Sequence, residues 1–262
     1  MAGNEQKIAE YLVLNKGNIS LRHLGIIKSI GAPDSSRDGY VEMNSAKDVY
    51  RYLATEDSRK KADIYINGHG ISVKQIGASF AYNRWQRANL VEIFELLKFK
   101  TSISILNRLD QEIRDFHEGN LERRNRPWSD FFTESEFKAI VKFLMIEGSP
   151  NVGFSTHPAK LVLEAPAANI SAENINVYTF DEYFKEYLAK LKIAIRRQWI
   201  GQASNSEHNR AKSLAKKPGN APWVFNDVSG LPNIHKSGAR WRKDVPAKDR
   251  KTVYFLMIEK ET

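Results

Sequence analysis

The stretch ADIYINGHGISVKQIGASFAYNR, residues 62–84, contains the pattern on which the expected fold depends. Apolar and polar residues alternate along residues 63–66, as they do in a strand that buries one face. The Asn-Gly-His-Gly sequence at residues 67–70 has the composition of a tight turn, and residues 71–74 alternate again. The stretch therefore predicts a β-hairpin.

The register of this hairpin decides which side chains meet. A turn at residues 67–70 pairs residues whose numbers sum to 137, so that Asp63 lies opposite Lys74, and a two-residue turn at Gly68 and His69 gives the same pairs. The Cβ atoms of opposed residues are about 5 Å apart. Because side chains alternate along a strand, one face carries Asp63, Tyr65, Ser72 and Lys74, and the other, apolar face carries Ile64, Ile66, Ile71 and Val73.

Two interpretations of the Asp63–Lys74 pair are open on the sequence alone. The first is a cross-strand ion pair on a solvated face, which contributes roughly 0–1 kcal/mol to stability. In the second, Asp63 binds a hard cation through oxygen, while Lys74 orients or deprotonates a water or stabilises developing negative charge. Hydrolysis of a phosphodiester needs that combination of a metal and a nearby base or cation.

The order of residues around Lys74 resembles a known catalytic motif. Asp63, followed by Ser72, Val73 and Lys74, is similar to the motif of the PD-(D/E)XK nucleases, which include most type II restriction endonucleases. This resemblance implies that Asp63 binds Mg²⁺, that the backbone carbonyl of Val73 contributes to the metal site, and that Lys74 is catalytic. Ala62 stands where the motif usually has Pro, which is not a ligand.

Ser72 is the main departure from the motif, because Glu or Asp usually stands at this catalytic position. Some restriction enzymes with Ser-Val-Lys recruit the missing carboxylate from the following helix, and others with Gln or Asn use fewer direct ligands. The resemblance makes Glu92 and Glu95, on the following predicted helix, and Glu10, on the first one, candidates for a recruited acid. The alternative is that each is a charge on a solvated helix face.

Periodicity along the rest of the chain predicts a mixture of helices and strands. Helices are expected near Ile8, from Leu21 to Gly31, from Ser45, Ala88 and Ser102, after Thr133 and over residues 180–195; strands are expected at residues 161–165 and 252–259, and a basic loop or mobile segment at residues 201–222. The layout resembles the small restriction enzymes of the Hin type that cut four-base palindromes. It implies an α/β fold with a central mixed β-sheet flanked by helices, helical N-terminal and middle segments, and basic C-terminal loops and strands.

The net charge of +9 is concentrated at the end of the chain. Residues 185–262 carry 17 Lys/Arg and 7 Asp/Glu, whereas residues 1–184 carry 23 and 24. A local positive field attracts a polyanion, and the aromatic residues between the charges distinguish this region from a solubilising tail. We therefore expect one catalytic domain over residues 1–262, in which residues 1–184 form the catalytic core and helical part and residues 185–262 recognise double-stranded DNA.

Basic side chains late in the chain are the predicted DNA contacts, with a solvated charged loop as the alternative for each. Arg240 is the first choice for a two-pronged contact to guanine in the major groove. The further predicted contacts are Asn83, Arg84, Arg210, Lys212, Lys216, Lys217, Lys236, Arg242 and Lys243.

The composition excludes several other classes of site. The chain has no cysteine, which rules out disulfides, Cys-ligated zinc and a thiol nucleophile and fits a reducing compartment. Walker and dinucleotide-binding fingerprints are missing from the sequence. No run of about 18 apolar residues is present, and the first residues lack the order of a secretory signal, so we expect a cytoplasmic protein without a membrane span.

Together these features predict a Mg²⁺-dependent type II restriction endonuclease that acts, as a monomer or a homodimer, on a short sequence of double-stranded DNA. A repair nicking or junction-cutting nuclease with the same motif is one alternative. The other is a non-catalytic DNA- or RNA-binding protein in which Asp63 and Lys74 form only an ion pair.

Overall fold

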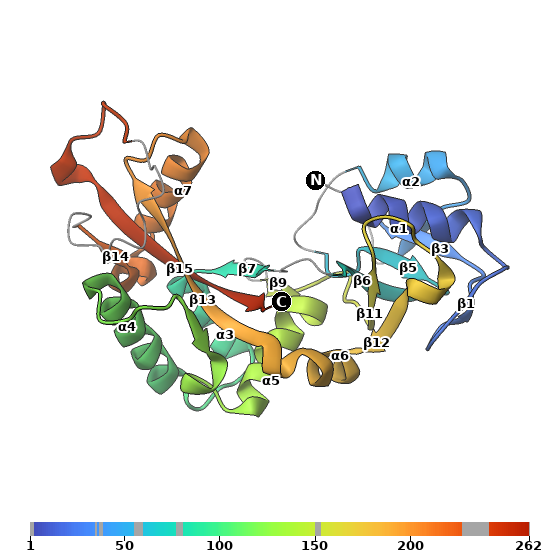
Figure 1. Cartoon of the computed structure of the whole chain (residues 1–262), viewed down its shortest axis with the longest axis horizontal. Coiled ribbons are helices and arrows are strands. Elements are labelled where there is room, and N and C mark those ends of the chain that lie inside the picture. Colours follow the sequence, from blue (N-terminus) through green and yellow to red (C-terminus); the bar gives the residue numbers. More distant parts are fainter. Residues whose placement is uncertain are drawn as a thin grey trace. The chain divides into compact units, whose positions relative to one another are not determined.

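The computed structural model describes residues 3–34, 36, 39–54, 60–76, 81–149, 153–226 and 241–261. The chain divides into two compact units (Figure 1): unit 1 comprises Met1–Phe80, Lys138–Lys190 and Thr262, and unit 2 comprises Ala81–Phe137 and Leu191–Glu261. The chain passes between the units near residues 80, 137 and 190, whereas the sequence predicts one domain whose two parts meet at residue 184. None of the helices in the described ranges is long and apolar enough to cross a bilayer.

Unit 1 is built on a six-stranded sheet with the order β12-β11-β6-β5-β3-β4. Strands β6 and β11 are parallel and the other neighbours are antiparallel, so the predicted α/β class with a mixed sheet is confirmed. The sheet strands are β3 (Ile30–Pro33), β4 (Tyr40–Glu42), β5 (Ile64–Ile66), β6 (His69–Gln75), β11 (Leu161–Ala165) and β12 (Asn176–Thr179). The other elements are α1 (Gly3–Leu14), β1 (Ser20–Leu21), β2 (Gly25–Ile26), α2 (Ala46–Tyr52), η2 (Phe143–Glu147), β9 (Gly148–Ser149), β10 (Gly153–Phe154), η3 (Ala172–Asn174), α6 (Phe180–Tyr187) and η4 (Leu188–Lys190), while α5 (Glu134–Lys142) runs from unit 2 into unit 1.

The core of unit 1 lies on the apolar face that the sequence predicts for the hairpin. Helix α1 packs against β3 and β6, and its Ile8 and Leu12 belong to one buried cluster with the apolar side chains of β5 and β6. Ile64, Ile66 and Ile71 are fully buried. Val73 is buried as well. Burial of these four branched side chains fixes the position of the hairpin in the sheet and leaves the other face of the hairpin for polar residues.

The segment from Leu21 to Gly31 is not helical, and this prediction is wrong. The chain there forms the short hairpin β1–β2 and then enters β3. His23 and Gly25 have φ angles of 64° and 66°, in the left-handed region that no residue of an α-helix adopts. The apolar residues Ile27 and Ile30 are nevertheless fully buried, so their spacing reports burial and not a helix.

The hairpin itself is confirmed, but its predicted register is wrong by two residues. A two-residue turn at Asn67 and Gly68, with φ angles of 50° and 77°, joins β5 to β6 and pairs Ile64 with Ile71. Asn-Gly is the preferred sequence for such a turn because both residues tolerate positive φ. The side-chain oxygen of Asn67 also accepts hydrogen bonds from the backbone N–H groups of Lys28 and Ser29.

A shift of two residues keeps every side chain on its predicted face, because the side-chain period of a strand is two. Continuing the observed pairs by one step places Asp63 beside Ser72, and Lys74 lies diagonally from Asp63. Direct opposition of Asp63 and Lys74 is therefore replaced by a diagonal relation across the same polar face.

Unit 2 is built around a long antiparallel pair, β13 (Leu191–Ile200) and β15 (Lys251–Lys260). The sheet order is β14-β15-β13-β8, and β7 also pairs with β15. The helices predicted from Ala88 and Ser102 are confirmed, and so is the strand predicted at residues 252–259. The remaining elements are β7 (Ala81–Trp85), α3 (Arg87–Leu96), α4 (Ser102–Glu118), β8 (Asn125–Pro127), η1 (Trp128–Asp130), α7 (Asn205–Ala215), η5 (Pro218–Trp223), β14 (Val224–Phe225) and η7 (Ala247–Asp249).

Two predictions in the last third of the chain are wrong. The helix expected over residues 180–195 ends at Tyr187, and residues 191–195 instead belong to β13, which pairs with β15 over its whole length. The segment 201–222, expected as a loop or mobile segment, contains α7. Ser204 caps this helix by accepting a hydrogen bond from the N–H of Glu207.

Candidate active site

Asp63, the residue just before β5, meets Val73 and Lys74 of β6. The N–H of Val73 donates a hydrogen bond of 2.6 Å to Oδ2 of Asp63, so the carboxylate takes the place of a strand partner. Nζ of Lys74 lies 3.9 Å from the same Oδ2 and donates to the carbonyl oxygen of Val73 over 3.1 Å. Since the N–H and C=O of one strand residue point to the same side, the Val73 carbonyl faces the side of Asp63.

The surroundings of Asp63 are partly closed to water. Its side chain is 24% exposed, that of Lys74 is 21% exposed, and Ser72 between them is buried. Burial raises the pKa of the Asp63 carboxyl above its ordinary value, against the lowering effects of the Lys74 ammonium and the Val73 N–H. Because water screens the Asp63 carboxylate incompletely, a charge added nearby changes its pKa more than it would change that of an exposed carboxylate.

Lys61 is a second ammonium at this site, and the sequence reasoning does not single it out. Burial, followed by repulsion from Lys74, lowers the pKa of Lys61 to about 8, and Asp63 acts in the opposite direction. The backbone N–H of Lys61 donates to the carbonyl of His157, which fixes the chain two residues before Asp63. The signal in the sequence is its alternation with Asp63, which places both on one face of an extended chain.

Replacing Lys61 by Met is expected to stabilise the protein at pH 7. Below about pH 8 the folded protein carries a buried positive charge on Lys61. Between about pH 8 and the ordinary pKa of 10.5, Lys61 is neutral in the folded protein but still protonated in the unfolded chain. Wild-type stability therefore rises with pH across that window. At roughly 1.4 kcal/mol per pKa unit, the variant should gain about 1–3 kcal/mol at pH 7 and lose the advantage towards pH 10.5.

Urea denaturation of both proteins at pH 7 and pH 10 in EDTA measures this difference. The control is Lys60→Met, since the Lys60 ammonium donates to the carbonyl of Pro33 and this variant should show no such gain. An unchanged difference between Lys61→Met and wild type at the two pH values would contradict the assignment.

Glu164 is a buried carboxylate on the strand next to Lys74. The parallel register pairs Glu164 with Lys74, so both side chains lie on the polar face of the sheet. Oε1 of Glu164 accepts from the hydroxyl of Tyr183 (3.2 Å) and Oε2 from that of Tyr187 (2.5 Å), both on α6. The sequence predicts the strand but not this carboxylate at the edge of the site, because its closeness to Lys74 depends on pairing between strands about 90 residues apart.

The three candidates for a recruited acid have different surroundings. Glu10 accepts a hydrogen bond of 2.7 Å from the hydroxyl of Tyr50 and belongs to the packing of α1 on α2. Glu92 and Glu95 are exposed residues of α3 in unit 2. Across the described ranges, no group of three or more histidine, aspartate and glutamate side chains comes together in a way that could hold a metal ion.

The oxygen donors that the site does offer suit Mg²⁺. This ion takes oxygen ligands, keeps several waters and is often held by one or two carboxylates. The carboxylate of Asp63 and the carbonyl of Val73 supply two such oxygens at one place, and both already lie close to Lys74. The donor set thus fits a largely hydrated Mg²⁺ ion.

The predicted DNA contacts that the structure describes lie in unit 2, and several have acidic partners. Arg84 stacks over the ring of Phe255 at 5.0 Å and lies 3.9 Å from Glu207, which also pairs with Arg210. Arg242 makes a two-pronged contact with Asp244. Asn83 lies on β7, while Lys212, Lys216, Lys217 and Lys243 are exposed.

Residues 201–222, which the sequence predicts as a basic loop or mobile segment, contain the helix α7. Lys216 is the C-cap residue of this helix and not part of an extended loop, and Lys217 follows it. Lys236 and Arg240 fall outside the described residues. Their predicted roles, and the choice of Arg240 for base reading, stay predictions.

Comparison with models of protein families, with curated protein sequences and with solved structures finds no match for this chain. Local geometry and the distribution of charge are therefore the basis for assigning a function.

Proposed function

We propose that this protein is a Mg²⁺-dependent endonuclease of the type II restriction class that hydrolyses phosphodiester bonds in double-stranded DNA. The observation that carries the proposal is the convergence of the Asp63 carboxylate, the Val73 backbone and the Lys74 ammonium at adjoining strands. A mere surface ion pair would not need a carboxylate that also replaces a strand partner, nor side chains that are about three-quarters buried.

Each residue has a defined part in this proposal. Asp63 and the carbonyl of Val73 would hold Mg²⁺, which supplies a Lewis acid for the phosphate oxygen. Lys74 orients the attacking water and, as a cation, stabilises the negative charge that develops on the oxygens of the phosphate. Lys61 adds a second ammonium group near Asp63 and Lys74, where Ser72 stands in place of an acid, and this positive charge would favour the binding of an anionic phosphodiester.

The distribution of charge supports DNA as the substrate. Unit 2 carries 24 Lys/Arg and 16 Asp/Glu, whereas unit 1 carries 16 and 15. The excess is therefore almost wholly on the unit that holds the predicted contacts, and a positive field of this kind binds nucleic acid through the release of counterions.

Incubation of supercoiled plasmid and linear duplex with the protein and Mg²⁺, with parallel samples in EDTA, tests the proposal. Discrete fragments that form only with Mg²⁺ are the expected result. Nicked circles without fragments would favour a repair or junction-cutting nuclease. Retarded but intact DNA would leave a non-catalytic binding protein.

Ser72→Ala is expected to be a mild variant. Ser72 donates a hydrogen bond that lowers the pKa of Asp63, and loss of one such bond corresponds to about 1 kcal/mol, or roughly a fivefold decrease in kcat. Single-turnover cleavage compares it with Glu10→Gln, Glu92→Gln and Glu95→Gln. A Ser72→Ala defect as large as that of Asp63→Ala would show that the hydroxyl itself takes part in the chemistry.

A further inference from the structure

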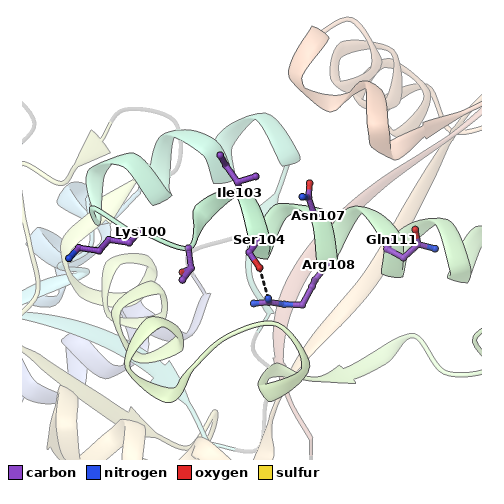
Figure 2. A pocket seen from close by; sticks show the side chains of 7 residues that line it. Lys100, Ile103, Ser104, Asn107, Arg108 and Gln111 are labelled. Atoms are coloured by element: carbon purple, nitrogen blue, oxygen red, sulfur yellow. Dashed lines mark hydrogen bonds between the residues drawn. The ribbon is translucent and has the colours of Figure 1, made fainter.

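Several arginines of unit 2 have acceptors within the chain. In the open groove of about 660 Å³ beside α4, Arg108 donates to the hydroxyl of Ser104 (Figure 2) and to the carbonyl of Phe131. Three arginines whose side chains are between 19% and 26% exposed pair with a carboxylate instead: Arg87 with Asp110, Arg126 with Glu112 and Arg196 with Glu259. In each of these cases the positive charge is balanced, or its N–H groups are accepted, by the protein itself.

Arg197 on β13 differs from these arginines. Its Nε, Nη1 and Nη2 atoms are all buried, and none of them makes a hydrogen bond to the part of the chain that the structure describes. The guanidinium stacks over the ring of Trp199, with Cζ at 4.9 Å from the ring centroid. Burial lowers the pKa of Arg197, but a guanidinium keeps its proton inside a protein, so the positive charge stays.

Further buried donors lie on the same face of the sheet. In the register of β13 and β15 (Figure 1), Arg197 pairs with Tyr254 and Trp199 with Thr252, so all four side chains are on one face. Nε1 of Trp199 and Oγ1 of Thr252 are buried and, within the described ranges, have no hydrogen-bond partner. The guanidinium and the indole have donors and no acceptor, so a hydroxyl between strands cannot satisfy both of them.

The hydroxyl of Tyr254 does not supply the missing negative charge. Burial raises the pKa of Tyr254 to about 12, against the lowering effect of Arg197, so the phenol is neutral at pH 7. Its oxygen also lies 3.2 Å from Nδ1 of His117. A neutral hydroxyl that is shared with a histidine leaves most of the N–H groups of Arg197 without an acceptor.

An uncompensated cation surrounded by free donors has the chemistry of an oxyanion site. Burial of a charge is strongly unfavourable unless the charge is paired, and a water molecule would leave it unpaired. A guanidinium matches the oxygens of a phosphate through a two-pronged contact, and a phosphate has further oxygens for the indole N–H and the hydroxyl. Because the donor atoms are buried, they favour a small free ion over the backbone of a duplex or the surface of another protein.

We propose that Arg197, Trp199 and Thr252, which we call the Arg197 site, bind a free tetrahedral oxyanion of the phosphate type. Arg197 supplies the charge and a two-pronged contact, while the indole N–H and the threonine hydroxyl donate to other oxygens of the same ion. The inference does not rest on the proposed function, because the site shares no residue with the candidate active site and its test needs no DNA cleavage.

Equilibrium dialysis of the full chain against radiolabelled inorganic phosphate, in a chloride buffer of constant ionic strength, measures binding directly. The wild-type protein should bind phosphate saturably, and Arg197→Met should lower the affinity about 100-fold or more. Trp199→Phe keeps an aromatic ring beside the guanidinium but removes the N–H donor, so it should lower the affinity about 10- to 150-fold. Arg114→Met removes an exposed arginine of the same unit and should bind phosphate as the wild type does.

Thermal denaturation separates a ligand site from a purely structural arginine. Phosphate at about a hundred times its Kd should raise the Tm of the wild-type protein by roughly 5–11 °C. Without phosphate, Arg197→Met should be at least as stable as the wild type, because it removes an uncompensated buried charge, and with phosphate it should be less stable. A structural arginine would instead make the variant less stable by the same amount in both buffers.

Four results would overturn the inference. The first is a wild-type protein that binds no phosphate, and the second is wild-type affinity in Trp199→Phe, which decides the matter if Arg197→Met folds poorly. The third is phosphate binding that occurs only in Asp227→Asn, since Asp227, which lies outside the described residues, would then be the partner of Arg197. The fourth is a dependence on Arg197 of duplex binding but not of phosphate binding, which would assign the site to the DNA backbone.

Discussion

Lys74→Ala is expected to reduce cleavage by about 10³-fold or more while the affinity for duplex DNA changes less than about threefold. The Lys74 ammonium lies among the Asp63 carboxylate and the Val73 carbonyl, where it would act on charge that appears only in the transition state. Removing one such electrostatic contact typically lowers kcat by 10²–10³, and more where the same group also orients the attacking water. DNA affinity should persist, because most of the excess positive charge is on unit 2.

Asp63→Ala should have a similar effect for a different reason, since it removes the carboxylate that would hold Mg²⁺ and the hydrogen-bond acceptor of Val73. Single-turnover cleavage with saturating protein separates the chemical step from binding, which gel retardation measures independently. Lys47→Ala, on the exposed side of α2, is the matched control and should cleave normally. If either Lys74→Ala or Asp63→Ala cut DNA at the wild-type rate, the site assignment would be wrong.

The largest expected effect on stability comes from Asp110→Ala in unit 2. Oδ1 of Asp110 accepts from Nε of Arg87 (2.8 Å) and from Nε1 of Trp223 (2.7 Å), and Oδ2 accepts from Nη2 of Arg87 (2.8 Å). The variant would leave a guanidinium that is 20% exposed and a fully buried indole N–H without this acceptor. Loss of one partner from such a pair costs about 3 kcal/mol, which lowers the Tm of a chain of this size by roughly 6–12 °C.

Thermal and urea denaturation measure this destabilisation, with Glu118→Ala at the exposed end of the same helix as control. Among the described residues, the side chain of Glu118 has one hydrogen-bond partner, the amide of Asn120 at 3.4 Å, so its removal should change the free energy of unfolding by less than about 0.5 kcal/mol. Asp110→Asn keeps one oxygen to accept from Trp223, so its loss of stability should lie between those of Asp110→Ala and Glu118→Ala. Equal stability of Asp110→Ala and Glu118→Ala would show that the buried contacts contribute nothing.

The polar and apolar faces of the hairpin follow from the sequence alone. Ile64, Ile66, Ile71 and Val73 alternate with polar residues, and alternation is a property of each strand by itself, whatever its partner is. For this reason Asp63, Ser72 and Lys74 are on one face in the prediction and in the structure, even though the predicted register is wrong by two residues. The helix expected from Ser45 is equally local and is confirmed as α2, which Ser45 caps.

The sequence does not determine secondary structure where long-range pairing competes with local preference. Residues 191–195 have a pattern that is compatible with a helix, but they are the first half of β13, whose ten residues all pair with β15, about 60 residues later, and this pairing makes them a strand. Conversely, residues 205–215 form the helix α7 although their polar composition does not predict one. Its buried residues, His208, Ala211 and Leu214, become apparent only when the sheet of unit 2 is present for them to pack against.

The sequence by itself therefore determines the α/β class, the hairpin and the face on which Asp63 and Lys74 lie. Only the tertiary structure buries Lys61 and brings it near Lys74, which together lower its pKa, and only the pairing of β6 with β11 brings Glu164 beside Lys74. The physical reason is range: side-chain alternation is set by backbone geometry over a few residues. The burial and electrostatic environment of a charge depend instead on which distant segments pack around it.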